Sequence, residues 1–407
     1  MTTTADSAKI AFAVAERLLD PESVAAAVPG PGTASLARGL AGTALLHARL
    51  SATDPVFAAA ADHHWAKAAA YAGPTGYEGP GVYHNPGGLA ASLIIGTAYL
   101  PAPESRHQAV ERAARWMSAQ AVDLAGQHQA HQAAGEIGTP RHVYDVITGL
   151  TGIGRVLLAS VRTGHDAEPG LLAALTSLTT MIHTRHGPLP GWWSSNTPTE
   201  APCAATGIAH GIAGPLMLLS QARVAGHEVD GQAEAIREAA AWLLRWQISD
   251  TRDWPPYVTE TELTTGIAAP VSGRRDAWCY GTPGIHRALT AAARAIGDPA
   301  LGEAADNARS ALIARLAACW DVAGPALCHG YAGVLQATRD DQAAAAVIAL
   351  FNNSDRFGFP RAAKPSETSE DPGFLTGAAG AALALADHGA IPAAPGADPW
   401  EVLLLLA

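Results

Sequence analysis

The sequence has little of several features that would assign it quickly to a class of protein. Charged residues make up only 15% of its 407 residues, and aromatic residues only 6%. The formal net charge is -11, so a basic surface for nucleic acid is not expected. Residues 1–7 are polar and lack a basic stretch followed by an apolar one, so no signal peptide is predicted. These absences favour a soluble, cytoplasmic protein.

Long apolar runs and cysteine clusters are also missing. The longest uncharged apolar stretches, such as residues 374–386, are shorter than the roughly 20 residues that a membrane-spanning helix needs, so membrane insertion is not predicted. Four cysteines are too few for a disulfide framework, and none belongs to a C-x-x-C pair of the zinc-finger type. Two of them, Cys203 and Cys319, are predicted to be buried as small hydrophobic residues.

What the sequence does contain is a repeated glycine motif, Gly-x-x-Gly, placed directly before an apolar stretch of helical length. Glycines three residues apart share one face of a helix and let neighbouring backbones approach closely. In one copy the second glycine is replaced by Ala91, a change expected to affect packing only. The seven copies are residues 39–42, 88–91, 149–152, 211–214, 281–284, 330–333 and 377–380.

The intervals between the copies have room for a second, more polar helix. Regular pairs of helices, none of which buries its apolar face alone, indicate a solenoid or a closed ring. We therefore predict an all-α fold, an α/α toroid of seven helix-pair repeats that forms one domain over residues 1–407. A further amphipathic helix is predicted at residues 8–20. The second helices are predicted at residues 56–72, 104–125, 171–184, 233–248 and 301–319.

Two long intervals break this regularity. Residues 186–205 and 250–275 are rich in proline, tryptophan and threonine, so they are predicted to be extended loops or short strands rather than helices. Each precedes a motif copy with chemically reactive residues. Such loops often bind substrate, and the alternative is a cap that only closes one end of the ring.

The residues with chemistry occupy matching positions in successive repeats. Cys279 and Cys328 both lie two residues before the first motif glycine, and His329 follows Cys328 directly. Equivalent positions of a ring converge on one end of its central channel, so two thiols and one imidazole, ligands that zinc prefers, are expected to meet. Three protein ligands leave a fourth position open, as catalytic zinc sites do. Coincidental packing is the competing explanation.

These motifs resemble those of the lanthionine synthetase C-like family, the lanthipeptide cyclases. The resemblance rests on Trp-Cys-Tyr-Gly at residues 278–281, Cys-His-Gly at residues 328–330 and His-Gly at residues 210–211, each with its second motif glycine. It covers nearly the whole chain, because the family fold is an α/α toroid of seven such repeats. Since no dehydratase segment is evident, the chain is similar to the stand-alone cyclases of class I pathways.

The resemblance implies a zinc-dependent lanthionine synthetase that binds one zinc ion per chain through Cys279, Cys328 and His329. It implies catalytic or other active-site roles for four further residues: His210, Asp145, Arg275 and Tyr280. Asp145 is expected to orient His210, and Arg275 to offset negative charge. A plain ion pair for Asp145 and Arg275, and a packing role for Tyr280 and Trp278, are the alternatives.

The implied reaction is the addition of a cysteine thiol to a dehydroalanine or dehydrobutyrine of the same peptide, which forms a lanthionine or methyllanthionine ring. The implied partners are a dehydrated precursor peptide with core and leader, a dehydratase and a transporter complex. Three other interpretations remain open: addition of an external thiol such as glutathione, a peptide-binding scaffold without chemistry, and an α/α-barrel glycosidase. The last would need six repeats and paired carboxylates, whereas seven repeats are counted.

Overall fold

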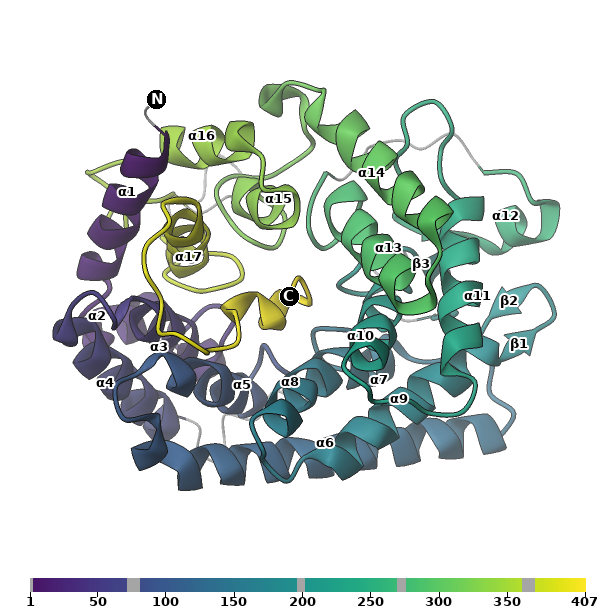
Figure 1. The fold of residues 1–407 in the computed structure, drawn as a ribbon, viewed down its shortest axis with the longest axis horizontal. Helices are drawn as coiled ribbons and strands as arrows, with labels where there is room; N and C mark the ends of the chain where they lie inside the picture. Colours follow the sequence, from purple (N-terminus) through teal and green to yellow (C-terminus); the bar gives the residue numbers. More distant parts are fainter. Residues whose placement is uncertain (1–2, 72–80, 196–201, 269–275, 361–369) are drawn as a thin grey trace. The chain divides into compact units, whose positions relative to one another are not determined.

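The computed structural model describes residues 3–71, 81–195, 202–268, 276–360 and 370–407 (Figure 1). The chain divides into two compact units, which are described separately. Unit 1 combines Met1–Arg115 with Val322–Ala407, and unit 2 is the continuous stretch Trp116–Asp321. Both units contain many fully buried apolar side chains. The organisation of residues 1–407 as one domain stays a prediction.

Each copy of the glycine motif lies at the start of a helix, and these motif helices are almost entirely buried. They confirm the seven apolar helices predicted from the sequence. In unit 1 the motif helices are α3 (Leu40–Leu50), α5 (Gly87–Gly96), α15 (Tyr331–Thr338) and α17 (Ala378–His388). In unit 2 they are α8 (Leu150–Arg162), α10 (Ala213–Val224) and α13 (Thr282–Ile296).

A second helix packs on five of the seven motif helices and follows each of them in the chain, as the repeat pattern predicts. In unit 1, α4 (Pro55–Tyr71) packs on α3 and α16 (Asp341–Ala349) on α15. In unit 2, the corresponding pairs are α9 (Glu168–His183) on α8, α11 (Gln232–Arg245) on α10, and α14 (Pro299–Ile313) on α13. The second helix after α5 is α6 (His107–Ala133), which runs from unit 1 into unit 2. The prediction of an all-α fold of helix pairs is thus confirmed.

The last repeat takes its second helix from the other end of the chain. No helix follows α17 except the short 3₁₀ segment Trp400–Leu404 in the described part of the chain. Instead α1 (Thr3–Arg17) packs against α17 within unit 1 (Figure 1). The first and last helices of the chain therefore form one pair.

The second glycine of the motif is needed because the chain turns back on itself just before the helix. A Cβ atom on Gly284 would lie 2.4 Å from the carbonyl oxygen of Trp278 and 2.6 Å from Cγ2 of Ile208. Since Cβ contacts below about 3 Å do not occur without a shift of the neighbours, alanine would push the preceding turn away. The glycines thus permit close approach to the chain's own turn as well as to a neighbouring repeat.

The two irregular intervals contain the four short strands of the described residues. Strand β1 (Arg185–His186) pairs antiparallel with β2 (Leu189–Pro190), and β3 (Ala204–Ala205) pairs antiparallel with β4 (Tyr257–Val258). Short strands were predicted here. The prediction that these intervals contain no helix is wrong, because α12 (Glu260–Thr265) follows β4, and the side chains of Thr259 and Glu262 bond the backbone at its start.

The remaining helices are short. The α-helices are α2 (Pro21–Ala27) and α7 (Arg141–Tyr144). The 3₁₀ segments are Pro31–Ala34, Thr97–Tyr99, Pro103–Arg106, Ala317–Cys319 and Trp400–Leu404. Among the described residues, no helix combines the length and the apolar character that crossing a membrane requires.

Candidate active site

Backbone hydrogen bonds join the turns that precede the motif helices. In unit 2, the amide of Val146 donates to the carbonyl of Ala209 at 2.9 Å, and the amide of Ala209 donates to the carbonyl of Cys279 at 3.3 Å. These residues precede α8, α10 and α13 at nearly equivalent motif positions. The turns of three repeats are therefore held in register, which brings the residues beside them into one neighbourhood.

The same arrangement recurs in unit 1. The amide of Cys328 donates to the carbonyl of Leu375 at 2.9 Å, and the amide of Leu375 donates to the carbonyl of Ala37 at 2.8 Å. Cys328 and Cys279 thus occupy matching positions in two series of linked turns. The metal ligands were predicted because they occupy matching motif positions. The backbone hydrogen bonds between turns explain what holds those positions in register.

His210 and Asp145 form a hydrogen-bonded pair in unit 2. Nδ1 of His210 donates to Oδ2 of Asp145 at 2.6 Å, although the residues are 65 positions apart in the chain. The side chain of Asp145 is 3% exposed, whereas that of His210 is 32% exposed. Because Nδ1 is engaged with the carboxylate, Nε2 is the nitrogen left for proton exchange with a substrate. This hydrogen bond is what an orienting role of Asp145 requires, and the catalytic roles of both residues stay predictions.

The second oxygen of Asp145 anchors the carboxylate to the start of α8. Oδ1 accepts hydrogen bonds from the amide of Thr148 at 2.7 Å, from its hydroxyl at 3.0 Å and from the amide of Gly149 at 3.1 Å. These amides would otherwise be unsatisfied at the helix start, where negative charge is favourable. The carboxylate is thus fixed on both sides. Among the described residues, its ion-pair partner is His210 and not an arginine.

A group of tyrosines surrounds His210. The ring of Tyr280 is 6.1 Å from that of His210, and the ring of Tyr257 is 5.4 Å from that of Tyr280. Burial, with the neighbouring Tyr257 hydroxyl, raises the pKa of Tyr280 well above its ordinary value, so Tyr280 is a neutral phenol at neutral pH. The hydroxyl of Tyr144 donates to the backbone carbonyl of His210 at 3.0 Å and helps to fix its position.

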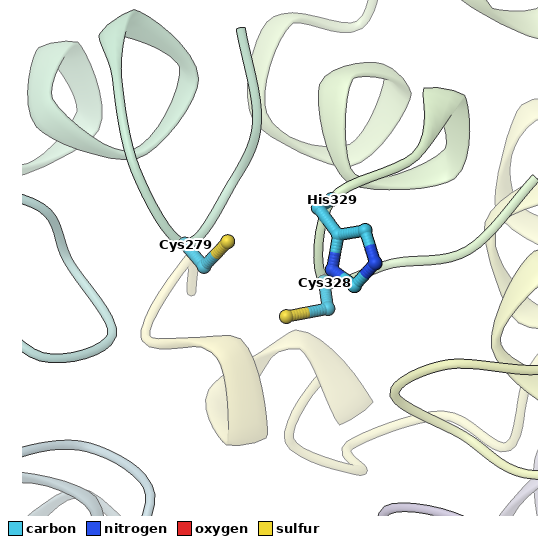
Figure 2. Close-up of side chains that lie close together, drawn as sticks. All are labelled: Cys279, Cys328 and His329. Atoms are coloured by element: carbon cyan, nitrogen blue, oxygen red, sulfur yellow. The ribbon is translucent and has the colours of Figure 1, made fainter. Parts of the chain in front are cut away.

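The three predicted metal ligands lie in two turns that are built alike (Figure 2). Cys279, in unit 2, is 6% exposed and precedes α13. Cys328 and His329, in unit 1, are partly exposed and precede α15. Each of the three side chains offers one donor atom, a thiol sulfur or an imidazole nitrogen. The donor chemistry fits a zinc ion.

The other predicted positions have different outcomes. Arg275 lies outside the described residues, so its role stays a prediction. Trp278 is completely buried, in agreement with a packing role. Cys203 is buried as predicted, but the prediction for Cys319 is wrong. Cys319 is exposed, because α14 ends at Ile313 and Cys319 belongs to the 3₁₀ segment that follows.

Reasoning from the sequence missed Arg141 and the two tyrosines Tyr144 and Tyr257. Arg141 is buried and places its guanidinium carbon 5.5 Å from the centre of the Tyr257 ring. Its spacing offers a signal, since it precedes Asp145 by four residues, as Arg275 precedes Cys279. Nothing in the local sequence indicates that Tyr257, more than 100 residues later, lies beside it.

Comparison with known proteins gives a consistent result. Residues 30–390 match the family described as lanthionine synthetase C-like protein. The nisin biosynthesis protein NisC of Lactococcus lactis subsp. lactis is 24% identical over 204 residues, which are 47% of this chain and only 48% of NisC. The solved structure of a nisin cyclase is similar with a TM-score of 0.76 and 18% identity, over 96% of each chain. At that identity the likeness concerns the fold.

Proposed function

Because the chain belongs to the lanthionine synthetase C-like family, we propose that it is a lanthipeptide cyclase that forms lanthionine and methyllanthionine rings in a dehydrated precursor peptide. The hydrogen bond between Asp145 and His210 carries this proposal. It provides a positioned group for proton transfer, and the linked turns continue from it to Cys279. A dehydratase that supplies the substrate and a transporter complex are proposed partners.

The proposed reaction needs no reagent besides the peptide. A carbon–sulfur bond forms between the thiol of a substrate cysteine and the β-carbon of a dehydroalanine or dehydrobutyrine. The electron pair of the carbon–carbon double bond moves to the neighbouring carbonyl oxygen as an enolate, and it returns when the α-carbon accepts a proton. The thiol loses one proton and the α-carbon gains one, so the ring forms without net gain or loss of atoms.

His210 is the proposed proton carrier in this reaction. Imidazole is the side chain that enzymes use most often to accept and donate protons in catalysis. Asp145 holds the ring so that Nε2 faces away from the carboxylate, and it stabilises the imidazolium form while the proton is on the ring. Whether His210 takes the thiol proton or delivers a proton to the α-carbon, the same pair performs the step.

The donor set of Cys279, Cys328 and His329 is proposed to hold one zinc ion. Two thiolates and one neutral imidazole balance the charge of Zn²⁺, and three protein ligands suit a catalytic rather than a structural site. Zinc bound there would lower the pKa of the substrate thiol and so favour its nucleophilic thiolate form. Because the ligands belong to both units, the proposal requires that the two cysteine turns meet.

Metal content is the first measurement that tests this proposal. We expect about one zinc per chain for the wild-type protein, as one ligand set predicts, and its loss in Cys279→Ala. Cys203→Ala is the matched control, since it also removes a buried cysteine of unit 2 but should keep the metal. Folded wild-type protein that takes up no zinc would contradict the proposed metal site and favour a scaffold.

A dehydrated peptide with its own cysteine tests the reaction. We expect loss of the free thiol without a change of mass when the peptide is incubated with the protein alone. The alternative is that the protein adds external thiols. In that case the dehydro residue would react only after glutathione is added, and the mass of the peptide would increase by the mass of glutathione. Binding without any loss of thiol would support a scaffold.

A further inference from the structure

Arg141 is a buried cation that the reaction described above does not use. The residue is 8% exposed, and its Nε and Nη2 atoms have no hydrogen-bond partner among the described residues. In that part of the chain no carboxylate pairs with it. Burying an unpaired charge is unfavourable, so a charge kept in this state calls for a reason beyond packing.

The surroundings of Arg141 are aromatic and lead toward His210. The guanidinium carbon lies 5.5 Å from the centre of the Tyr257 ring, and Tyr257 contacts Tyr280, whose ring is 6.1 Å from His210. The hydroxyl of Tyr280 is also buried without a hydrogen bond that satisfies it. Aromatic rings stabilise a cation without neutralising it.

Asp145, the acidic residue of this site, does not form an ion pair with Arg141. Oδ2 of Asp145 is bound to His210, and Oδ1 is bound to Thr148 and Gly149. Arg141 therefore has no ion-pair partner among the described residues, and its positive charge sets up a field at the tyrosine ring beside it. In a buried environment such a field reaches further than in water, because little solvent is present to screen it.

We propose that Arg141 is a positioning residue that stabilises the enolate formed during ring closure. It acts through the tyrosines: its charge favours the Tyr280 hydroxyl as a hydrogen-bond donor and lowers the energy of negative charge on the carbonyl oxygen of the dehydro residue. The inference rests on the proposed cyclase function and extends it, because it adds an electrostatic group from unit 2 to the Asp145–His210 pair.

Replacing Arg141 tests this role through the separation of kcat and KM. For Arg141→Met we expect kcat for cyclisation to fall about 10- to 100-fold, KM to change less than about twofold, and zinc content to remain unchanged. Arg141→Lys keeps the charge and should restore kcat to within about threefold of the wild-type value. If Arg141 only stabilises the fold, its replacement would lower thermal stability but would not lower kcat selectively.

Arg185→Met is the matched control. Arg185 also belongs to unit 2 and lies 5.4 Å from the centre of an aromatic ring, that of Trp192, but it is partly exposed and paired with Glu238. We expect this variant to cyclise at the wild-type rate. Should Arg141→Met not fold, Tyr257→Leu removes the ring beside the guanidinium, and we expect kcat to fall about 10-fold with unchanged KM.

The outcomes separate the inference from the function on which it rests. Wild-type kcat in folded Arg141→Met, or in Tyr257→Leu if the former does not fold, would overturn the role of Arg141 and leave the cyclase proposal intact. Equal loss in the Lys and Met variants would overturn a role based on charge. Wild-type protein that does not cyclise the dehydrated peptide overturns both.

Discussion

Two buried aspartates of unit 2 lie in similar turns but have different partners. Asp145, before α8, is bound to His210. Asp276, before α13, is 1% exposed and receives two hydrogen bonds from Arg315, at 2.7 and 3.0 Å, and one from the amide of Asp321 at 2.9 Å. Both carboxylates are fully bonded, so burial and hydrogen bonding alone do not distinguish them.

The difference lies in what the partner can do. Arginine keeps its proton in proteins, so Arg315 cannot exchange a proton with a substrate, and its pair with Asp276 holds the segment after α14 against the turn. Histidine gains and loses a proton near neutral pH, and the side chain of His210 is partly exposed. The same kind of acid is therefore proposed to be structural in one turn and catalytic in the other.

The largest effect is expected for removal of the imidazole. His210→Ala should lower kcat for cyclisation by about 10⁴-fold, because it removes the proposed proton carrier. Zinc content should remain that of the wild-type protein, since His210 is not among the proposed ligands. Both quantities are measured on the same purified sample, and a wild-type rate would show that His210 has no role in proton transfer.

Asp145→Asn should lower kcat by about 10³-fold. The amide oxygen can still accept from the amides of Thr148 and Gly149, so the start of α8 is preserved. The amide nitrogen, however, donates to Nδ1 of His210 and forces the proton to Nε2, the wrong tautomer for a base. We therefore expect this variant to unfold at nearly the wild-type temperature while its kcat is reduced.

Asp276→Asn should act on stability instead. Removing the charge leaves Arg315 without its main partner, and we expect a loss of about 2–3 kcal/mol in the free energy of unfolding, less than for a fully buried pair because Arg315 is partly exposed and Asp253 lies 3.6 Å away. Denaturant titration measures this change. A large fall in kcat at full stability would contradict the distinction between the two acids.

The smallest effect concerns two buried histidines, His47 and His64, which form hydrogen bonds to neutral groups. Burial lowers the pKa of His47 to about 3 and that of His64 to about 4, both in unit 1. Their folded-state pKa values lie below 6.5, so the unfolded chain binds more protons and stability is lost as the pH falls below about 6.5. We expect each to contribute about 1 kcal/mol of destabilisation at pH 5.5. Urea unfolding at pH 7.5 and 5.5 should show a weaker pH dependence in His47→Gln.

The helix-pair repeat can be predicted from the sequence because all of its signals lie within short stretches of the chain. A glycine motif, an apolar helix and a more polar helix follow each other within each interval, and each signal is readable there. The pairing of α1 with α17 is not readable, because it depends on which surfaces remain uncovered after the other pairs have formed. Likewise α12 is six residues long, and its capping residues are easily taken for loop.

The site is predictable where it depends on motif register. The resemblance implied that Asp145 orients His210, and the hydrogen bonds between turns explain how successive repeats bring these two residues together. It failed for Arg141, whose importance depends on burial and on a tyrosine from a distant segment. It failed for Cys319 because the end of α14 decides whether that thiol is covered.

The pairing of α1 with α17 also has a consequence for the order of events during translation. Unit 2 is continuous, so it can complete its core while synthesis continues, whereas α1 is made before unit 2 and its partner α17 is made after it. We expect residues 3–17 to be cut by protease in ribosome-bound chains until α17 emerges, and earlier protection would contradict this order. A helix made before unit 2 would thus pack only after unit 2 has been synthesised.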